Sequence, residues 1–179
     1  MIEREIKLAF RTAGEARAAL VAAGAAPLAP RRLQDDVLYD TRDRALFAQR
    51  SALRLRREDA RAVLTFKGPV TPGLTKSREE IETAVGSHDA AADLLARLGF
   101  EPWFRYQKYR EEFTAEGVIA AVDETPAGVF VEIEGREDAI IALAAKLGRG
   151  PSEFILDSYR AIWVAYQQAR AAGAGDMLF

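Results

Sequence analysis

The sequence predicts an α+β fold in which about eight strands form a β-barrel and four helices pack on its outside. Three observations predict it. Many short segments alternate strictly between apolar and polar residues, short turn-forming segments join them, and only a few longer segments carry the start and stop signals of helices. The strands also have one charged face and one apolar face, and the apolar faces would provide the surface on which helices pack.

The elements follow one another along the chain in a regular way. Thr12 can cap the first helix and Gly24 can end it. The Gly- and Pro-rich segment 68–73 is expected to be a loop, and it is a candidate for a flexible lid. Residues 1–172 are expected to form a single domain, followed by a loose C-terminal tail at 173–179. Strands are expected at 2–10, 37–41, 53–57, 62–67, 77–85, 105–114, 118–123 and 128–134, and helices at 13–23, 90–98, 138–147 and 158–171.

Composition excludes several classes of protein. The formal net charge of −2 argues against a general nucleic-acid-binding protein, which would be clearly basic. The chain has no cysteine, so it has neither a disulfide nor a thiolate site, and its single histidine, His88, argues against a histidine metal site or a Ser-His-Asp triad. The charged N-terminus has no apolar run behind it, which predicts a cytoplasmic protein without a membrane segment.

Charges recur at alternate positions on nearly every expected strand, and alternate side chains share a face. On the first strand, Glu3, Glu5 and Lys7 share one face, while Ile6 and Leu8 share the other. The later strands repeat the pattern with Arg54 and Arg56; Thr65 and Lys67; Arg78, Glu80 and Glu82; Lys108, Arg110 and Glu112; and Glu132 and Glu134.

An ordinary barrel with a solvated, charged outer face is one interpretation of this alternation. However, several strands carry same-sign pairs, such as Glu132 and Glu134 or Arg54 and Arg56. Such pairs repel each other unless an opposite charge lies between strands, which a solvent-facing surface would not require. We therefore predict an inverted barrel, with the charged faces inside and the apolar faces outside, under the helices.

A charged interior is costly unless a charged ligand fills it. The arginines and lysines suit phosphate oxygens, because Arg offers a planar donor fork and Lys a point charge. The glutamates offer hard oxygen ligands suited to Mg²⁺ or Mn²⁺. Together, cations and a carboxylate-held metal are the groups used in phosphoryl transfer.

The charged strand motifs resemble those of a known family. Glu3-Arg4-Glu5-Ile6-Lys7 resembles the Glu-x-Glu-x-Lys signature that opens proteins of the CYTH, or triphosphate tunnel, family. The resemblance runs from residue 2 to about residue 164. Further motifs follow in the family's order: Leu38-Tyr39-Asp40-Thr41, Leu53-Arg54-Leu55-Arg56, Phe66-Lys67-Gly68-Pro69, Arg78-Glu79-Glu80-Ile81-Glu82, Lys108-Tyr109-Arg110, Val122-Asp123 and Glu132-Ile133-Glu134.

The resemblance implies an eight-stranded antiparallel tunnel that binds a triphosphate and a divalent metal. It implies metal ligation by Glu3, Glu5, Glu132 and Glu134, and phosphate contacts from Lys7, Arg54, Arg56, Lys67, Lys108 and Arg110. Arg78 is a further candidate for phosphate binding. Asp123, Glu80 and Glu82 are expected to be interior acids that hold a second metal or order the cations, and Lys67, Glu80 and Glu82 are the candidate catalytic residues.

Two activities within the family remain open. Leu98-Gly99-Phe100-Glu101-Pro102, Tyr106-Gln107-Lys108-Tyr109-Arg110 and Ser158-Tyr159-Arg160 resemble the class IV adenylyl cyclases, whereas the Arg54–Arg56 pair resembles the triphosphatases. Leu38 stands where thiamine triphosphatases carry an aromatic residue. Hydrolysis is the favoured prediction, because water is a less demanding nucleophile than a ribose hydroxyl.

Two non-enzymatic functions explain less of the sequence. A polyphosphate-binding module would not need the full set of metal-type glutamates. A nucleic-acid-binding barrel would need an exposed aromatic platform, which the alternation lacks. Trp103 and Trp163 are expected to be packing residues, and a homodimer is possible, with Trp163 on the last helix as a candidate contact.

Overall fold

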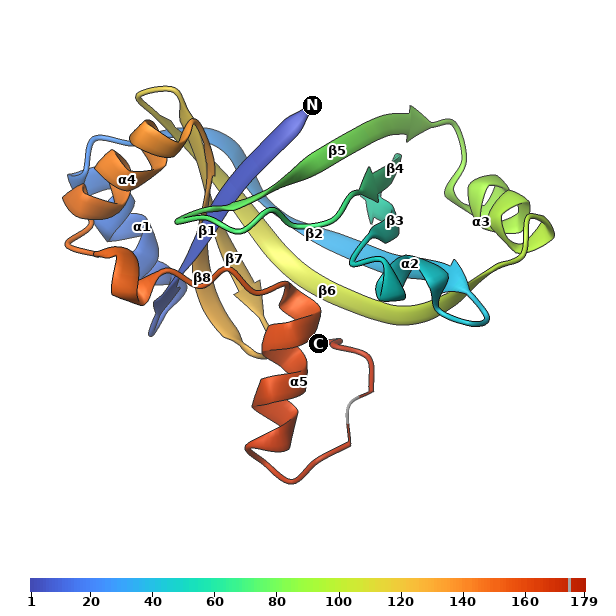
Figure 1. The fold of residues 1–179 in the computed structure, drawn as a ribbon. Coiled ribbons are helices and arrows are strands. Elements are labelled where there is room, and N and C mark those ends of the chain that lie inside the picture. Colours follow the sequence, from blue (N-terminus) through green and yellow to red (C-terminus); the bar gives the residue numbers. More distant parts are fainter. Residues whose placement is uncertain (174) are drawn as a thin grey trace.

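The chain forms a closed barrel of antiparallel strands in the order β1-β5-β4-β3-β2-β6-β7-β8 in this computed structural model, which describes residues 1–173 and 175–179. Helices lie outside the barrel and across one of its ends (Figure 1). The prediction of an α+β barrel with outer helices is confirmed. The strands are β1 (Ile2–Phe10), β2 (Ala26–Thr41), β3 (Ala52–Glu58), β4 (Arg61–Lys67), β5 (Lys76–Val85), β6 (Phe100–Ala115), β7 (Val118–Thr125) and β8 (Gly128–Gly135). The helices are α1 (Ala13–Ala22), α2 (Ala45–Ala48), α3 (His88–Arg97), α4 (Glu137–Lys146), the 3₁₀ helix η1 (Pro151–Glu153) and α5 (Tyr159–Gln168).

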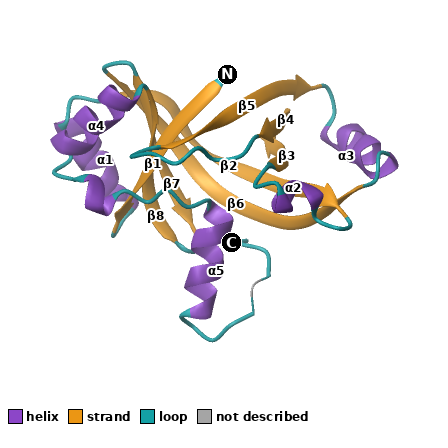
Figure 2. Cartoon of the chain, in the orientation of Figure 1, coloured by secondary structure: helices purple, strands orange, loops and turns teal. Residues whose placement is uncertain are grey.

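Two strands are longer than the sequence predicted. β2 begins at Ala26 rather than at residue 37, and it pairs with the equally long β6 (Figure 2). Pro27 and Pro30 argue against a strand because proline cannot donate to the ladder. The structure accommodates them at register shifts between Pro27 and Ala29 and between Ala29 and Arg32, where strand pairing is interrupted. The short helix α2 was also missed.

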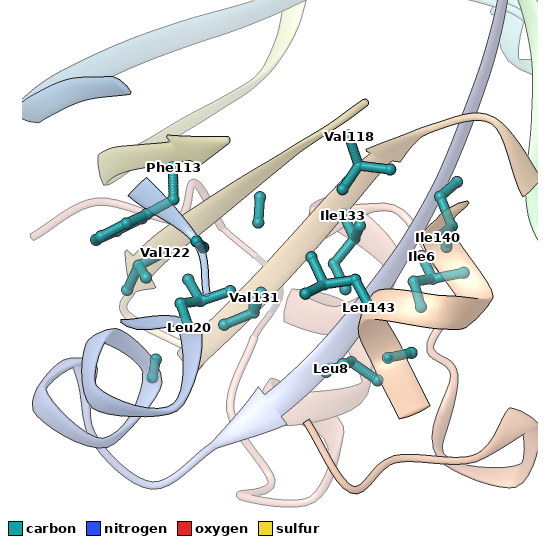
Figure 3. Packing of buried hydrophobic residues seen from close by; sticks show 14 residues of the cluster. Ile6, Leu8, Leu20, Phe113, Val118, Val122, Val131, Ile133, Ile140 and Leu143 are labelled. Carbon is teal, nitrogen blue, oxygen red and sulfur yellow. The ribbon is translucent and has the colours of Figure 1, made fainter. Parts of the chain in front are cut away.

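The barrel is inverted, as its alternation predicted. Ile6 and Leu8 of β1 are buried outside the barrel with Val131 and Ile133 of β8, beneath α1 and α4 (Figure 3). Leu20 of α1 belongs to the same core. Glu5 and Lys7, at the intervening positions of β1, are buried on the inner side.

The helix α5 lies against one end of the barrel and corrects two expectations. Trp163 is buried among aromatic residues, stacks on Tyr166 and donates its Nε1–H to the carbonyl of Gly175 at 2.7 Å. It is therefore not available as the proposed dimer contact. Nor is the end of the chain loose, because Met177 is fully buried and pairs with β6 through backbone hydrogen bonds to Arg105 and Gln107.

None of the helices in the described part of the chain has the length and apolar character needed to cross a membrane.

Candidate functional site: a charged tunnel

A cavity of about 810 Å³ runs inside the barrel and is lined by the charged faces of the strands. A pocket of this size lies within the range of small-molecule sites. The lining brings together all but one of the predicted site residues: Glu3, Glu5, Lys7, Arg54, Arg56, Lys67, Arg78, Glu80, Glu82, Lys108, Arg110, Glu132 and Glu134.

Asp123 is the exception, because it lies fully buried behind the cavity wall rather than on it. Its carboxylate accepts hydrogen bonds from Lys108 at 2.9 Å, from Arg110 at 2.6 and 2.7 Å and from the hydroxyl of Tyr159 at 2.5 Å. Because Asp123 holds both cations of β6, its contacts favour a positioning role over the predicted metal ligation. Burial opposes ionisation, but Arg110 and Lys108 hold the pKa of Asp123 below its usual value.

Side chains of the first strand link neighbouring strands through a series of ion pairs on the inner face of the barrel. Lys7 Nζ lies 2.8 Å from Glu5 and 3.1 Å from Glu132, and Glu132 also accepts from Arg110 at 2.6 Å. Glu5 accepts in turn from Lys76 of β5 at 2.7 Å. These contacts follow from the register, because Glu5 lies opposite both Lys76 and Glu134 and Lys7 lies opposite Glu132.

A second group of ion pairs lies where β5 runs between β1 and β4. Lys67 Nζ contacts Glu3 at 2.9 Å and Glu80 at 2.6 Å, and Arg78 Nε lies 3.4 Å from Glu3. A smaller hollow of the surface, lined by Met1, Glu3, Glu80, Ile81, Glu82 and Glu134, opens at this place. The predicted catalytic residues Lys67 and Glu80 therefore lie beside Glu3 on the acidic side of the tunnel, whereas the third, Glu82, contacts Arg54 at 3.4 Å.

Three residues of the site were missed by sequence reasoning. Asp36 is fully buried and pairs with Arg56 at 2.8 Å and Arg54 at 3.5 Å. Extending the second strand backwards would have identified it. Lys76 shares the face of Arg78 and Glu80, one step before the expected start of that strand. Tyr159 was noted only as part of the Ser158-Tyr159-Arg160 motif, and its contact with Asp123 could not be foreseen because α5 meets the barrel only through the tertiary fold.

The buried charges perturb one another strongly. Burial and the neighbouring Arg110 lower the pKa of Lys108 to about 8, although Asp123 and Glu132 oppose this shift. Burial and Lys7 similarly lower the pKa of Lys76 to about 8. Burial, together with repulsion from Glu3 and Glu132, raises the pKa of Glu134 to about 7. Such clustered shifts are typical of functional sites.

The donor chemistry of the acidic side fits a hard divalent cation. Glu3, Glu5, Glu132 and Glu134 line the tunnel and offer only carboxylate oxygens, the ligand type that such cations prefer. Within residues 1–173 and 175–179, no group of three or more such side chains is arranged as a metal site. Glu5 and Glu132 instead accept from ammonium and guanidinium groups, so binding a cation there requires their side chains to reorient.

Comparisons with known proteins agree with this geometry. Residues 1–148 match the family model described as the CYTH domain. A Methanocaldococcus jannaschii protein provisionally named an adenylate cyclase is 31% identical over 105 residues, which is 58% of this chain. The match spans 60% of that relative, less than two thirds of its length.

Two solved structures share the fold at low sequence identity. A Vibrio parahaemolyticus protein, provisionally named an adenylate cyclase, has a TM-score of 0.80 at 20% identity, over 90% of this chain and 97% of that chain. A Hippeastrum protein, provisionally named an adenylyl cyclase and described as having a dominant triphosphatase activity, has a TM-score of 0.68 at 20% identity. It aligns over 92% of this chain and 95% of its own.

Proposed function

Because the chain belongs to the CYTH domain family, we propose that it is a divalent-metal-dependent enzyme that hydrolyses a triphosphate inside the barrel. The observation that carries the proposal is the tunnel itself, in which cations from several strands converge on one cavity beside a group of carboxylates. A cytoplasmic place of action is part of this proposal.

The cations would bind and orient the triphosphate. Arg56 donates hydrogen bonds to Asp36, Arg54 lies 3.5 Å from the same carboxylate, and Lys108 and Arg110 are fixed by Asp123. Each carboxylate therefore pre-positions two donors, which lowers the reorganisation needed when charge develops on the leaving group. Lys7 and Lys67 would bind phosphate oxygens from the other side of the cavity.

The carboxylates Glu3, Glu5, Glu132 and Glu134 would hold the metal. When bound, a divalent metal neutralises charge on phosphate oxygens and activates water. Glu80 and Glu82 remain candidates for accepting the proton of the attacking water, because both line the cavity, Glu80 in contact with Lys67 and Glu82 in contact with Arg54.

An adenylyl cyclase is the second candidate. It is favoured by the name of the Methanocaldococcus jannaschii relative, while the activity described for the Hippeastrum protein favours hydrolysis. In a cyclase, the ribose 3′-hydroxyl of ATP attacks the α-phosphorus and pyrophosphate leaves. Hydrolysis ranks first because it requires only water as the nucleophile.

Product analysis of the purified chain tests the proposal. Inorganic triphosphate, ATP and thiamine triphosphate are offered separately with Mg²⁺ or Mn²⁺, and orthophosphate, pyrophosphate and cyclic AMP are measured. Orthophosphate without cyclic AMP is expected. Cyclic AMP with matching pyrophosphate would reverse the ranking, and binding of triphosphate without turnover would instead indicate a polyphosphate-binding module.

A further inference from the structure

Three elements bring an aromatic and arginine-rich cluster to one part of the cavity wall. Phe47 of α2 and Trp103 of β6 meet edge-to-face, with ring centroids 5.4 Å apart. The guanidinium of Arg160, in the first turn of α5, lies 4.4 Å from the Trp103 centroid and 5.1 Å from that of Phe47. All three line the same cavity as the tunnel cations.

The arginines of this cluster differ from those inside the tunnel. Arg54, Arg56 and Arg110 all have carboxylate partners. In the part of the chain that the structure describes, Arg160 and Arg44 make no ion pair, and a buried Nη atom of Arg44 has no hydrogen-bond partner. Burial and the nearby Arg44 lower the pKa of Arg160. Among the described residues, therefore, no carboxylate lies within ion-pairing distance of these two arginines.

The helix that carries Phe47, α2, is flanked by two residues in an unusual backbone conformation. Arg44 and Arg50, which flank α2, adopt φ angles of 61° and 59°, a region that non-glycine residues seldom occupy. Asp40 fixes the helix by accepting hydrogen bonds from the backbone N–H groups of Leu46 and Phe47. Phe47 nevertheless leaves about half of its surface (53%) exposed. Conformational strain of this kind tends to gather at functional sites.

We propose that Phe47, Trp103 and Arg160 form a subsite for the organic part of the substrate, which binds a neutral, planar heteroaromatic ring such as a nucleobase. This rests on the proposed binding of a triphosphate in the tunnel, and it assigns a nucleoside triphosphate, rather than inorganic triphosphate, as the preferred substrate. An aromatic face and a planar guanidinium both stack on bases without regard to their hydrogen-bonding edges.

The unbalanced arginines also predict which ring is rejected. Arg44 and Arg160 repel a ring that carries a positive charge, such as the thiazolium of thiamine triphosphate, because like charges in a partly buried site interact strongly. A neutral base meets no such repulsion, and its phosphates meet additional positive charge on the way into the tunnel.

The test compares ATP with inorganic triphosphate in the full chain and its variants. Because stacking on an aromatic side chain contributes to base binding, Trp103→Ala should lower the ratio of kcat/KM for ATP to that for inorganic triphosphate by about tenfold. Trp103→Phe should restore most of the ratio. Phe47→Ala should lower it in the same direction, and its side chain is exposed enough for the variant to fold. Leu98→Ala, which truncates an exposed side chain outside the cavity, should leave the ratio as it is.

Calorimetric titration of the same variants separates this proposal from that of hydrolysis. If no triphosphate is turned over, hydrolysis fails, but ATP should still bind more tightly than inorganic triphosphate to the wild-type chain and lose that advantage in Trp103→Ala. An equal loss for both ligands would show that Trp103 only supports the fold. No loss for either, or equal wild-type affinity for both, would likewise overturn the subsite.

Discussion

The two faces of the same strands form two regions with opposite physical demands. On β8, Val131 and Ile133 are fully buried against helices outside the barrel, whereas Glu132, between them, faces the tunnel in contact with Lys7 and Arg110. Burying apolar surface stabilises the outer face. Burying charges on the inner face costs free energy that their ion pairs offset only in part. Stability and ligand binding are thus assigned to alternate residues of one strand.

Metal removal should have the largest effect, and it should act on the inner face alone. We expect chelation with EDTA to lower turnover about a thousandfold, because metal neutralisation of phosphate charge contributes several kcal/mol to the transition state. The urea midpoint should fall only slightly, by the stabilisation that the bound metal itself provides, since the outer core contains none of the proposed ligands. Turnover that persists in EDTA would contradict the proposed metal dependence.

Lys67→Gln should have the next largest effect. It should lower kcat/KM about a hundredfold, because one preorganised donor to phosphate is lost. Steady-state kinetics with the metal present measure it. The matched control is Arg4→Gln, which removes an exposed cation from the outward positions of β1 and should leave turnover as it is. If both variants lose activity equally, the assignment of function to the inner face is wrong.

Ile133→Ala tests the contribution of the outer face to stability. Removal of this fully buried side chain should lower the free energy of unfolding by about 2–5 kcal/mol, measured by urea denaturation. Activity per folded molecule should persist. Ile81→Ala, at a side chain that is 57% exposed on β5, makes the same chemical change and should cost less than about 0.5 kcal/mol. Equal costs at both positions would show that burial under the helices does not stabilise the barrel.

The smallest effect is expected at the cap of α1, which covers the outer core. The Thr12 side chain accepts a hydrogen bond from the backbone N–H of Glu15 at 3.1 Å. Thr12→Ala should therefore cost about 1 kcal/mol of unfolding free energy, while Thr12→Ser keeps the acceptor and most of the stability. An equal loss in the two variants would assign the effect to the methyl group rather than to the cap.

Much of the fold and the site could be predicted because alternation records which residues share a face. Glu3, Glu5 and Lys7 were placed together by parity alone, as were Lys108 and Arg110, and the structure brings them to one cavity. The extents of β2 and β6 could not be predicted in this way. Their bulges interrupt the period of two, and the prolines of β2 are compatible with a strand only at such irregular positions.

Same-sign charge pairs on alternating strands were enough to infer the inverted barrel, because such pairs favour opposite charges on neighbouring strands. The folded arrangement selects the groups that neutralise these charges. It paired Asp36 with Arg54 and Arg56, moved Asp123 behind the wall, and placed α5 so that Tyr159 and Arg160 reach the tunnel. The physical reason is that parity fixes the face on which a side chain lies, whereas strand register and helix docking fix which side chains meet across it.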